Sequence, residues 1–230
     1  MKRYLITGAS RGIGRAIAEK IAGAGDCLLL HGRDRQALTA TSKMVEAKKA
    51  KAISLCYDLR DPVEIQKMVE EIGGEPLDAL INNAGIAFVK PLAEITLEEW
   101  QATFAVNVTA PFLLTQKLLP ILRSSSTIVN ILSTAAKTGF PNWSSYCMSK
   151  FALEGFSQAV REELRPRGIR VLNVYPAATS TEIWKGIEGD WPREKMLSSL
   201  EVAEAVAFAL SRPADVAVEN LSVQNVSGAL

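Results

Sequence analysis

Short apolar runs alternate with amphipathic stretches along the whole of this 230-residue chain, and this alternation restricts the possible folds more than any other feature. The apolar runs predict strands over Tyr4–Thr7, Cys27–His31, Ala52–Cys56, Leu77–Ile81, Thr127–Leu132, Arg170–Val174 and, near the end, about Leu221–Val226. The amphipathic stretches predict helices over Gly12–Ala24, Arg35–Lys49, Pro62–Ile72, Leu97–Leu119, Ser145–Leu164 and about Leu200–Leu210. The last of these carries a capping-box pattern at Ser198 and Glu201. Because the strands are apolar throughout, they require a sheet that is covered on both faces. Strict alternation of strand and helix then predicts an α/β fold, a doubly wound parallel β-sheet with helices on both faces.

Composition and charge indicate a single soluble domain over residues 1–230, since no linker, repeat or low-complexity segment divides the chain. Hydrophobic residues make up 48% and charged residues 22%, and the net charge is +1 without a long run of like charge. Nothing therefore points to nucleic acid or to a membrane as a partner. The N-terminal apolar stretch is too short for a signal peptide, and no apolar stretch approaches the length of a membrane helix. Three cysteines without a C-x-x-C pair fit a reducing compartment, with Cys27 and Cys56 expected to be buried thiols, so we expect a cytoplasmic protein.

A glycine-rich turn follows the first predicted strand and runs from Thr7 to Gly14 with the spacing G-x-x-x-G-x-G. Glycines at such a turn let the backbone approach a pyrophosphate, while the N-terminus of the following helix presents unpaired N–H groups. The alternative is a tight strand-to-helix turn without a ligand. The position of the glycine turn directly after the first strand favours a dinucleotide site of the Rossmann type.

The end of the second predicted strand indicates which dinucleotide binds. Enzymes that prefer NAD place an acid there to accept from the ribose hydroxyl, whereas an arginine suits the 2′-phosphate of NADP. Here Gly32 occupies the acid position, Arg33 follows it, and Arg11 of the glycine turn would lie near the same phosphate. We therefore expect NADP(H), with NAD(H) less favoured; the alternative is that Arg33 is simply solvated while Asp34 caps the next helix.

Asp58 follows the third predicted strand and is a candidate acceptor for the adenine amino group, with Leu59 against the ring. An ordinary turn aspartate explains Asp58 equally well.

Tyr146 and Lys150 lie four residues apart, on one face of a predicted helix. A cation beside a phenol lowers the phenol's pKa, so Tyr146 is a candidate general acid/base. Ser133 follows the fifth predicted strand, where open α/β sheets bind ligands, and can donate to a substrate carbonyl beside Tyr146. Chance placement on a helix surface is the alternative for a tyrosine and lysine pair alone.

Asn107 lies inside the predicted helix that begins with the capping box Thr96 to Glu99. Pro111, four residues later, has no N–H, so the carbonyl of residue 107 loses its helical partner and the helix should kink. A freed carbonyl there can hold an ordered water that leads to Lys150. An incidental kink is the alternative.

Together these residues resemble the motifs of the short-chain dehydrogenase/reductase family over nearly the whole chain. The resemblance implies an NADP(H)-dependent oxidoreductase that transfers a hydride between the nicotinamide and a carbonyl or secondary alcohol. The implied catalytic residues are Asn107, Ser133, Tyr146 and Lys150, with Tyr146 as proton donor and acceptor. The implied cofactor-binding residues are Gly8, Ser10, Arg11, Gly12, Ile13, Gly14, Arg33, Asp58, Leu59, Asn83, Ala84, Gly85, Tyr146, Lys150, Pro176, Thr179 and Thr181; no metal site is implied. The family's glycine after Pro176 is Ala177 here, which is a departure.

The substrate is expected at a mobile lid over about residues 182–197, which carries Trp184 and Trp191. Phe140 and Trp143 would form the opposite wall, and an apolar ketone or aldehyde fits best. The alternative is that these aromatic residues pack the lid onto its own domain. The sequence does not identify the physiological substrate, the stereochemistry or the direction of the reaction.

Further expectations concern partners, a competing function, His31 and the C-terminal tail. Small residues at Ala152, Gly155 and Ala159 permit close helix approach, and by the family resemblance we expect a homodimer or homotetramer. The competing function is a regulator that senses NADP(H) without turnover; such proteins would lose Ser133, Tyr146 or Lys150. His31 is expected to be a strand-end residue beside the cofactor, not a catalyst. The C-terminal tail weakly resembles reductases related to sepiapterin reductase.

Overall fold

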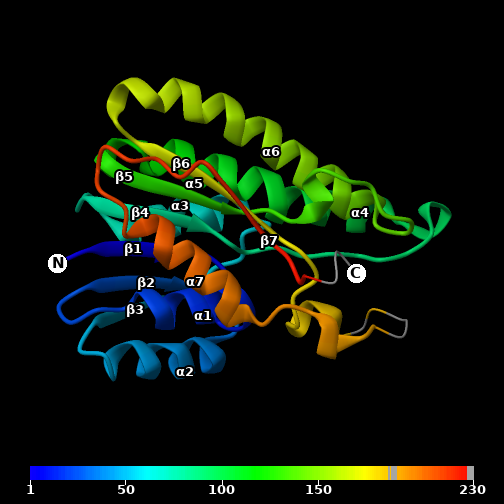
Figure 1. Ribbon diagram of the computed structural model, residues 1–230, viewed down its shortest axis with the longest axis horizontal. Coiled ribbons are helices and arrows are strands. Elements are labelled where there is room, and N and C mark those ends of the chain that lie inside the picture. The colour runs from blue at the N-terminus through cyan, green and yellow to red at the C-terminus, as the bar shows by residue number, and fades with distance from the viewer. Residues whose placement is uncertain (186, 188–190, 227–230) are drawn as a thin grey trace.

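Seven strands form one parallel sheet in the order β3-β2-β1-β4-β5-β6-β7 (Figure 1). The computed structural model describes residues 1–185, 187 and 191–226. The strands are β1 Arg3–Ile6, β2 Cys27–His31, β3 Lys51–Leu55, β4 Leu77–Asn82, β5 Leu122–Ile131, β6 Arg170–Pro176 and β7 Asn220–Val223. Since β1 pairs with β2 on one side and with β4 on the other, the order reverses there. The expected doubly wound parallel sheet is confirmed, and ligands bind such sheets at this switch point.

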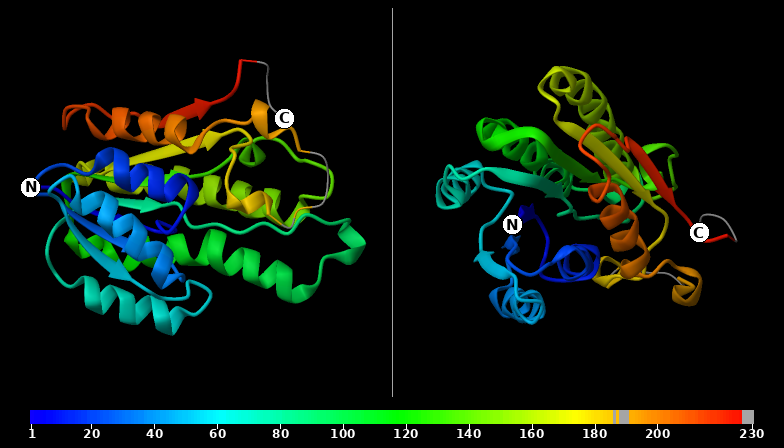
Figure 2. Two further views of the ribbon diagram at one scale, coloured as in Figure 1. Left: turned by 90° about the horizontal axis from the view of Figure 1, so that it is seen from below. Right: turned by 60° about the vertical axis from the view of Figure 1, so that its left-hand side comes forward.

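Helices cover both faces of the sheet (Figures 1 and 2). One face carries α1 Gly12–Ile21, α2 Arg35–Glu46 and α7 Ser199–Leu210; the other carries α3 Pro62–Ile72, α4 Leu97–Phe104, α5 Ala110–Leu118 and α6 Ser144–Leu164. Successive residues of β1 enter opposite cores: Leu5 packs with Met68 and Leu114, whereas Ile6 packs with Ile17 and Val206. A strand that is buried on both faces has no polar side, which explains the continuous apolar runs in the sequence.

The two edge strands depart from the expected pattern. Lys51 and Ser54 of β3 are exposed, as are Asn220 and Ser222 of β7, so neither strand is buried throughout. Cys56, just beyond β3, is only partly buried, so the expectation of a buried thiol was wrong there, whereas Cys27 is buried. Both departures have the same cause. An edge strand has a neighbouring strand on one side only, so its side chains are covered less completely than those of a central strand.

The expected helix caps are present. Asp34 accepts from the N–H of Ala37 at 3.0 Å and starts α2. Thr96 and Glu99 form a capping box before α4, and Ser198 and Glu201 form one before α7. These caps fix where each helix begins, although α1 and α2 end three residues earlier than their patterns indicated.

The helical run before β5 contains a π-turn at the position where a proline kink was expected. Residues Ala105–Thr109 are π-helical (η2), and the N–H of Ala110 bonds to the carbonyl of Ala105, five residues back. The wider turn accommodates Pro111, which has no N–H for the carbonyl of Asn107.

The same run, Leu97–Ile121, has the length and the mean hydropathy (25 residues, 1.2) of a membrane span, although no stretch of this kind was expected. Its buried side chains, among them Ala110, Leu114 and Leu118, belong to the core beneath the sheet.

Candidate active site

A cavity of about 910 Å³ lies at the carboxyl ends of β1, β2, β4, β5 and β6. Apart from Tyr146, fifteen of the predicted cofactor-binding residues line the cavity, and Gly14 does not. Ser133 and Tyr146 line it as well. The lining contains Gly8, Ser10, Arg11, Gly12, Ile13, Arg33, Asp58, Leu59, Asn83, Ala84, Gly85, Ser133, Tyr146, Lys150, Pro176, Thr179 and Thr181. Gly14 and Asn107 lie behind it. The sequence did not indicate Ile86, Ala87, Val106 or Ala178, which also line the cavity and are apolar neighbours of the motif residues.

The glycine turn is crowded by its own backbone. Gly8 has a φ of +67°, and a Cβ there would lie 2.9 Å from Asn83 Nδ2. A Cβ at Gly14 would lie 2.3 Å from the carbonyl oxygen of Gly8. Only glycine fits these positions without a backbone shift. Arg11 occupies the N-cap of α1. Because an arginine side chain has no hydrogen-bond acceptor, it does not cap the helix, and the first N–H groups of α1 remain free of a side-chain cap.

Two polar side chains hold this turn in place. Thr7 Oγ1 accepts from the N–H groups of Asn83 at 2.9 Å and Ala84 at 3.0 Å, which joins the ends of β1 and β4. The glycine pattern indicated no role for Thr7; a hydroxyl directly before the first glycine was the available signal. His31 Nε2 donates to the carbonyl of Tyr57 at 3.0 Å, and Nδ1 accepts from the N–H of Gly8 at 3.4 Å.

His31 is buried and lines the cavity, as expected of a strand-end residue. Burial lowers its pKa to about 4, partly offset by the hydrogen bond to Tyr57. The ring is therefore neutral at physiological pH, which its acceptor role toward Gly8 requires.

Two arginines border the cavity near the end of β2, and the position of the expected acid there is crowded. Arg11 and Arg33 are exposed and line the cavity. A Cβ at Gly32 would lie 3.1 Å from Ser10 Cβ, so a larger residue would press against the glycine turn. Asp34, the nearest acid along the chain, is engaged as the cap of α2.

Asp58 and Leu59 both reach the cavity, but Asp58 also behaves as a turn residue. Its Oδ1 accepts from the N–H of Arg60 at 2.9 Å, and its carboxylate pairs with the Arg60 guanidinium. The hydrogen bond from Arg60 is the main reason that the pKa of Asp58 lies below its usual value.

Ser133, Tyr146 and Lys150 meet on one wall of the cavity. Ser133 caps the short 3₁₀ turn η4 (Thr134–Ala136), accepting from the N–H of Ala135 at 3.1 Å, and its hydroxyl acts to lower the pKa of Tyr146. Lys150 Nζ lies 5.5 Å from the centre of the Tyr146 ring. It donates to the carbonyl of Ile131, the last residue of β5, at 2.8 Å.

Burial dominates the acid–base properties of this pair. It raises the pKa of Tyr146 to about 12, against a smaller lowering by Ser133, and it lowers the pKa of Lys150 to about 8. The net pKa of Tyr146 in the protein chain by itself is thus raised, where the sequence led us to expect a lowered one. Desolvation of the phenolate is the dominant cause, and the Lys150 ammonium is itself bonded to the carbonyl of Ile131.

Asn107 anchors the π-turn to the active-site wall. Its Oδ1 accepts from the N–H of Ile86 at 2.9 Å, and its Nδ2 donates to Ile86 O at 2.9 Å and to Ser149 Oγ at 3.0 Å. A Cβ at Gly85 would lie 3.5 Å from Asn107 Oδ1 and 3.8 Å from Lys150 Nζ, so Gly85 lets both side chains approach the loop. Ser149 was not predicted; its place directly before Lys150 was the only signal.

The segment after β6 folds over the glycine turn. Thr181 Cγ2 lies 3.3 Å from where a Cβ on Gly12 would stand. Thr179 Oγ1 donates to the carbonyl of Ala177 at 2.9 Å, and the carbonyl of Thr179 accepts from Trp184 Nε1 at 2.8 Å. The chain thus brings the ends of β1 and β6 to the same part of the cavity.

Three tryptophans form an aromatic cluster over Tyr146. The Trp143 ring lies 5.5 Å from Tyr146 and 5.5 Å from Trp184, and Trp184 lies 4.9 Å from Trp191. All of them line the cavity, as does Phe140. Trp184 is only 8% exposed, so part of the expected lid packs onto its own domain while still bordering the cavity. Residues 186 and 188–190 of the expected lid lie outside the described residues.

Comparison with known proteins identifies the family. Residues 2–190 match the family model described as short chain dehydrogenase. L-2,3-butanediol dehydrogenase of Corynebacterium glutamicum is 36% identical over 198 residues, which cover 82% of this chain and 76% of that protein. Sepiapterin reductase of Chlorobaculum tepidum is 32% identical over 237 residues, covering 97% of this chain and 96% of that protein.

A solved structure of a short chain dehydrogenase from Burkholderia cenocepacia J2315, in complex with NADP, superposes with a TM-score of 0.86. It is 32% identical, and the alignment covers 97% of this chain and 96% of that one. The fold and these matches agree. The chain belongs to the short-chain dehydrogenase family and is an oxidoreductase.

Proposed function

We propose that this protein transfers a hydride between NADP(H) and the carbonyl or secondary alcohol of a small apolar substrate, with Tyr146 as general acid/base. The observation that carries the proposal is the meeting of Ser133, Tyr146 and Lys150 on the wall of a cavity that also contains the glycine turn.

The residues present fit a nicotinamide dinucleotide. Gly8 and Gly14 admit no Cβ, so their backbone can approach a pyrophosphate at the N-terminus of α1. Arg11 and Arg33 line the cavity and would bind a 2′-phosphate, and the crowding at Gly32 disfavours the acid that an NAD enzyme uses. Asn83, Ala84, Pro176, Thr179 and Thr181 would border the nicotinamide half. The bound nucleotide would supply or accept the hydride.

The chain's own groups handle the proton. With a pKa of about 12, Tyr146 holds its proton at neutral pH and can donate it to a carbonyl oxygen. Ser133 would hydrogen-bond to the same oxygen, and Lys150 would bind the nicotinamide ribose. Asn107 would support a water relay to Lys150 through its backbone carbonyl, because its side-chain amide is already bonded to Ile86 and Ser149. The protonated form of Tyr146 is the form that reduction of a carbonyl uses.

The substrate end favours an apolar molecule. Its walls are the rings of Phe140, Trp143, Trp184 and Trp191, which offer large apolar surfaces. A small apolar ketone or aldehyde would place its carbonyl between Ser133 and Tyr146.

The test is to follow oxidation of NADPH, and in parallel NADH, with a panel of aldehydes, ketones, diketones and 3-oxo esters. We expect substrate-dependent oxidation of NADPH, reduced about 100-fold or more in Tyr146→Phe while NADPH binding persists. Tight NADPH binding without turnover by any substrate would favour the regulator, and retained activity in Tyr146→Phe would refute the role of the tyrosine.

We also propose that the protein is a cytoplasmic homodimer or homotetramer joined through α4, α5 and α6. Trp100, Phe104, Phe112 and Phe151 are between 38% and 47% exposed on these helices, which is unusual for large apolar rings. Light scattering at micromolar concentration tests this; a monomeric mass would refute it.

A further inference from the structure

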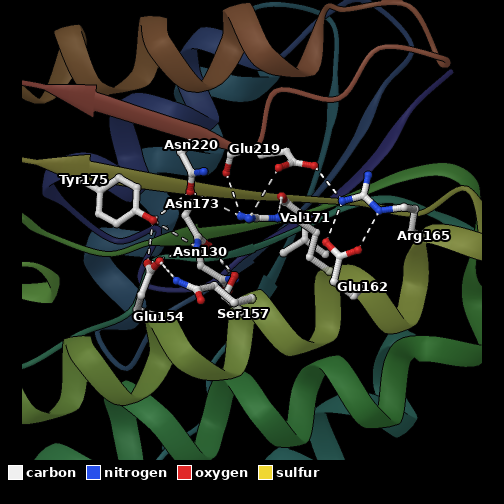
Figure 3. A network of polar contacts seen from close by, with 12 residues as sticks. Asn130, Glu154, Ser157, Glu162, Arg165, Val171, Asn173, Tyr175, Glu219 and Asn220 are labelled. Carbon is white, nitrogen blue, oxygen red and sulfur yellow. Dashed lines mark hydrogen bonds and ion pairs between the residues drawn. The ribbon is translucent and has the colours of Figure 1, made fainter.

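A buried carboxylate lies one helical turn beyond the catalytic lysine. Glu154 of α6 is 6% exposed, and it is four residues after Lys150. The carboxylate points from α6 toward β6 (Figure 3). A buried charge needs partners for all of its acceptor positions, otherwise it destabilises the fold.

Four donors fill the acceptor positions of this carboxylate. Oε1 accepts from Lys137 Nζ at 2.9 Å and from Gln158 Nε2 at 2.6 Å. Oε2 accepts from the Tyr175 hydroxyl at 2.6 Å and from Asn173 Nδ2 at 3.2 Å. Burial acts to raise the pKa of Glu154, but the bonds from Tyr175, Gln158 and Lys137 outweigh it and hold the pKa below its usual value. Glu154 is therefore ionised at neutral pH.

The donors come from the elements that carry the active site. Lys137 directly follows η4, the turn that begins at Ser133, and its ammonium also lies 4.7 Å from the centre of the Tyr175 ring. Tyr175 and Asn173 belong to β6, which ends at the edge of the cavity. One carboxylate thus connects the helix of Tyr146, the turn of Ser133 and the strand that leads to Thr179.

The sheet beside Glu154 is held by further buried bonds. Asn130 of β5 donates to Ser157 Oγ at 3.0 Å, and Ser157 donates to Asn173 (Figure 3). These bonds fix α6 against β5 and β6. The Ser133 turn joins this framework in two ways: Ala136 packs with Leu153 and Tyr175, and Lys137, whose side chain is 53% exposed, forms an ion pair with Glu154.

We propose that Glu154 is a positioning residue for the reaction: through Lys137 it holds the Ser133 turn at the distance from Tyr146 that proton transfer requires. The inference rests on the proposed function. Neither Glu154 nor Lys137 lines the cavity among the described residues, so neither is a catalytic residue.

The experiment compares Lys137→Met, Glu154→Gln and the double variant, with Lys67→Met as the matched control. Lys67 also donates to a glutamate, Glu64 at 2.8 Å, but on α3 and away from the cavity. Lys137→Met keeps the buried bonds from Tyr175, Asn173 and Gln158, so it remains informative if Glu154→Gln does not fold. The readouts are kcat, KM, the Kd for NADPH, Tm, and hydrogen exchange of the amides of Ala136, Lys137 and Thr138, which bond to Ser133 and Thr134.

We expect kcat to fall about tenfold to a hundredfold in both single variants, with the Kd for NADPH unchanged. The double variant should lose no more than Glu154→Gln alone, because the two residues act through one bond. Exchange should accelerate at residues 136–138, and the control should match the wild type.

A lower Tm with unchanged kcat would overturn the proposal and leave Glu154 a structural residue only. Wild-type protein without turnover would instead refute the proposed function. In that case hydrogen exchange alone tests the role of Lys137. Unchanged exchange at residues 136–138 in Lys137→Met would show that Lys137 does not hold the turn.

Discussion

The glycine turn after β1 and the aromatic cluster around Trp184 border the same cavity but are built by different means. At the turn, backbone atoms set the geometry, since a Cβ at Gly14 would lie 2.3 Å from a carbonyl oxygen. At the cluster, side chains set it, with rings of Trp143, Trp184 and Trp191 at centroid distances between 4.9 and 6.3 Å. A change at the turn must move the main chain, whereas a change at the cluster can be absorbed by a rotamer.

This difference separates what the fold requires from what can vary. The turn needs particular residue types at fixed spacings, so it can be shared by proteins with different substrates. The cluster needs apolar surface of suitable size and, apart from the bond of Trp184 to Thr179, no fixed polar contact, so it can change with the substrate. Substitutions at the turn should therefore affect stability and NADPH binding, and substitutions at the cluster should affect the substrate.

The largest effect at the turn is expected from protonation of His31, the single histidine of the chain. An unfolded histidine takes up a proton near pH 6.5, and the buried ring does so near pH 4. Between these values the unfolded state holds more protons, so the stability from the neutral ring is complete above about pH 6.5 and is lost as the pH falls toward 4. The loss should be about 3 kcal/mol in the free energy of unfolding.

An NMR titration of the one imidazole measures this pKa directly, and chemical unfolding at several pH values measures the loss. His31→Gln provides the control, because its stability should fall less over the same range. A pKa near 6.5 in the folded protein would show that the ring does not hold the turn as a buried acceptor.

Gly14→Ala should lower the free energy of unfolding by about 2 kcal/mol, because the added methyl group meets the backbone of Gly8 and cannot be relieved by a side-chain rotation. NADPH binding should weaken with it. Gly74→Ala is the control, since a Cβ there meets nothing within 4 Å. Thermal unfolding and an NADPH titration test both variants. Equal free energies of unfolding for the two variants would show that the backbone at Gly14 shifts at little cost. The glycine turn would then be no more rigid than the aromatic cluster.

The sequence predicted the turn well because glycine spacing reports directly on the backbone. The same holds for the helix caps at Asp34, Thr96 and Ser198, whose hydrogen bonds are local. It also predicted which strand ends would meet, because carboxyl ends of parallel strands share one edge of a sheet.

Properties that depend on packing across the fold were not predictable in the same way. The pKa of Tyr146 is set by burial, which the spacing to Lys150 does not report. The π-turn at Asn107 and the partners of Glu154 depend on contacts between elements far apart in sequence. The sequence predicted Trp184 as an aromatic residue of the lid, but it did not predict the hydrogen bond from Trp184 to the carbonyl of Thr179.

Arg33→Ala should reduce kcat/KM for NADPH about tenfold and leave kcat/KM for NADH nearly unchanged, because a charge-assisted bond to a phosphate is worth about 1.5 kcal/mol. Arg35→Ala is the matched control: Arg35 is also exposed at the start of α2, but it does not line the described cavity. Parallel steady-state kinetics with both cofactors measure the effect. An equal loss with NADPH and NADH would mean that Arg33 does not contact the group that distinguishes them.

The smallest effect is expected at the cluster itself. Trp184→Phe keeps an apolar ring but removes the N–H that bonds to the carbonyl of Thr179 at 2.8 Å. The loss of one such bond, about 1 kcal/mol, should raise KM for the carbonyl substrate roughly fivefold while the Kd for NADPH stays near the wild-type value. Trp100→Phe, on the outer face of α4, should change neither constant. If Trp184→Phe weakens NADPH binding as much as substrate binding, then Trp184 acts through the Thr179 backbone on the cofactor, and the aromatic cluster belongs to the cofactor end as well as to the substrate end.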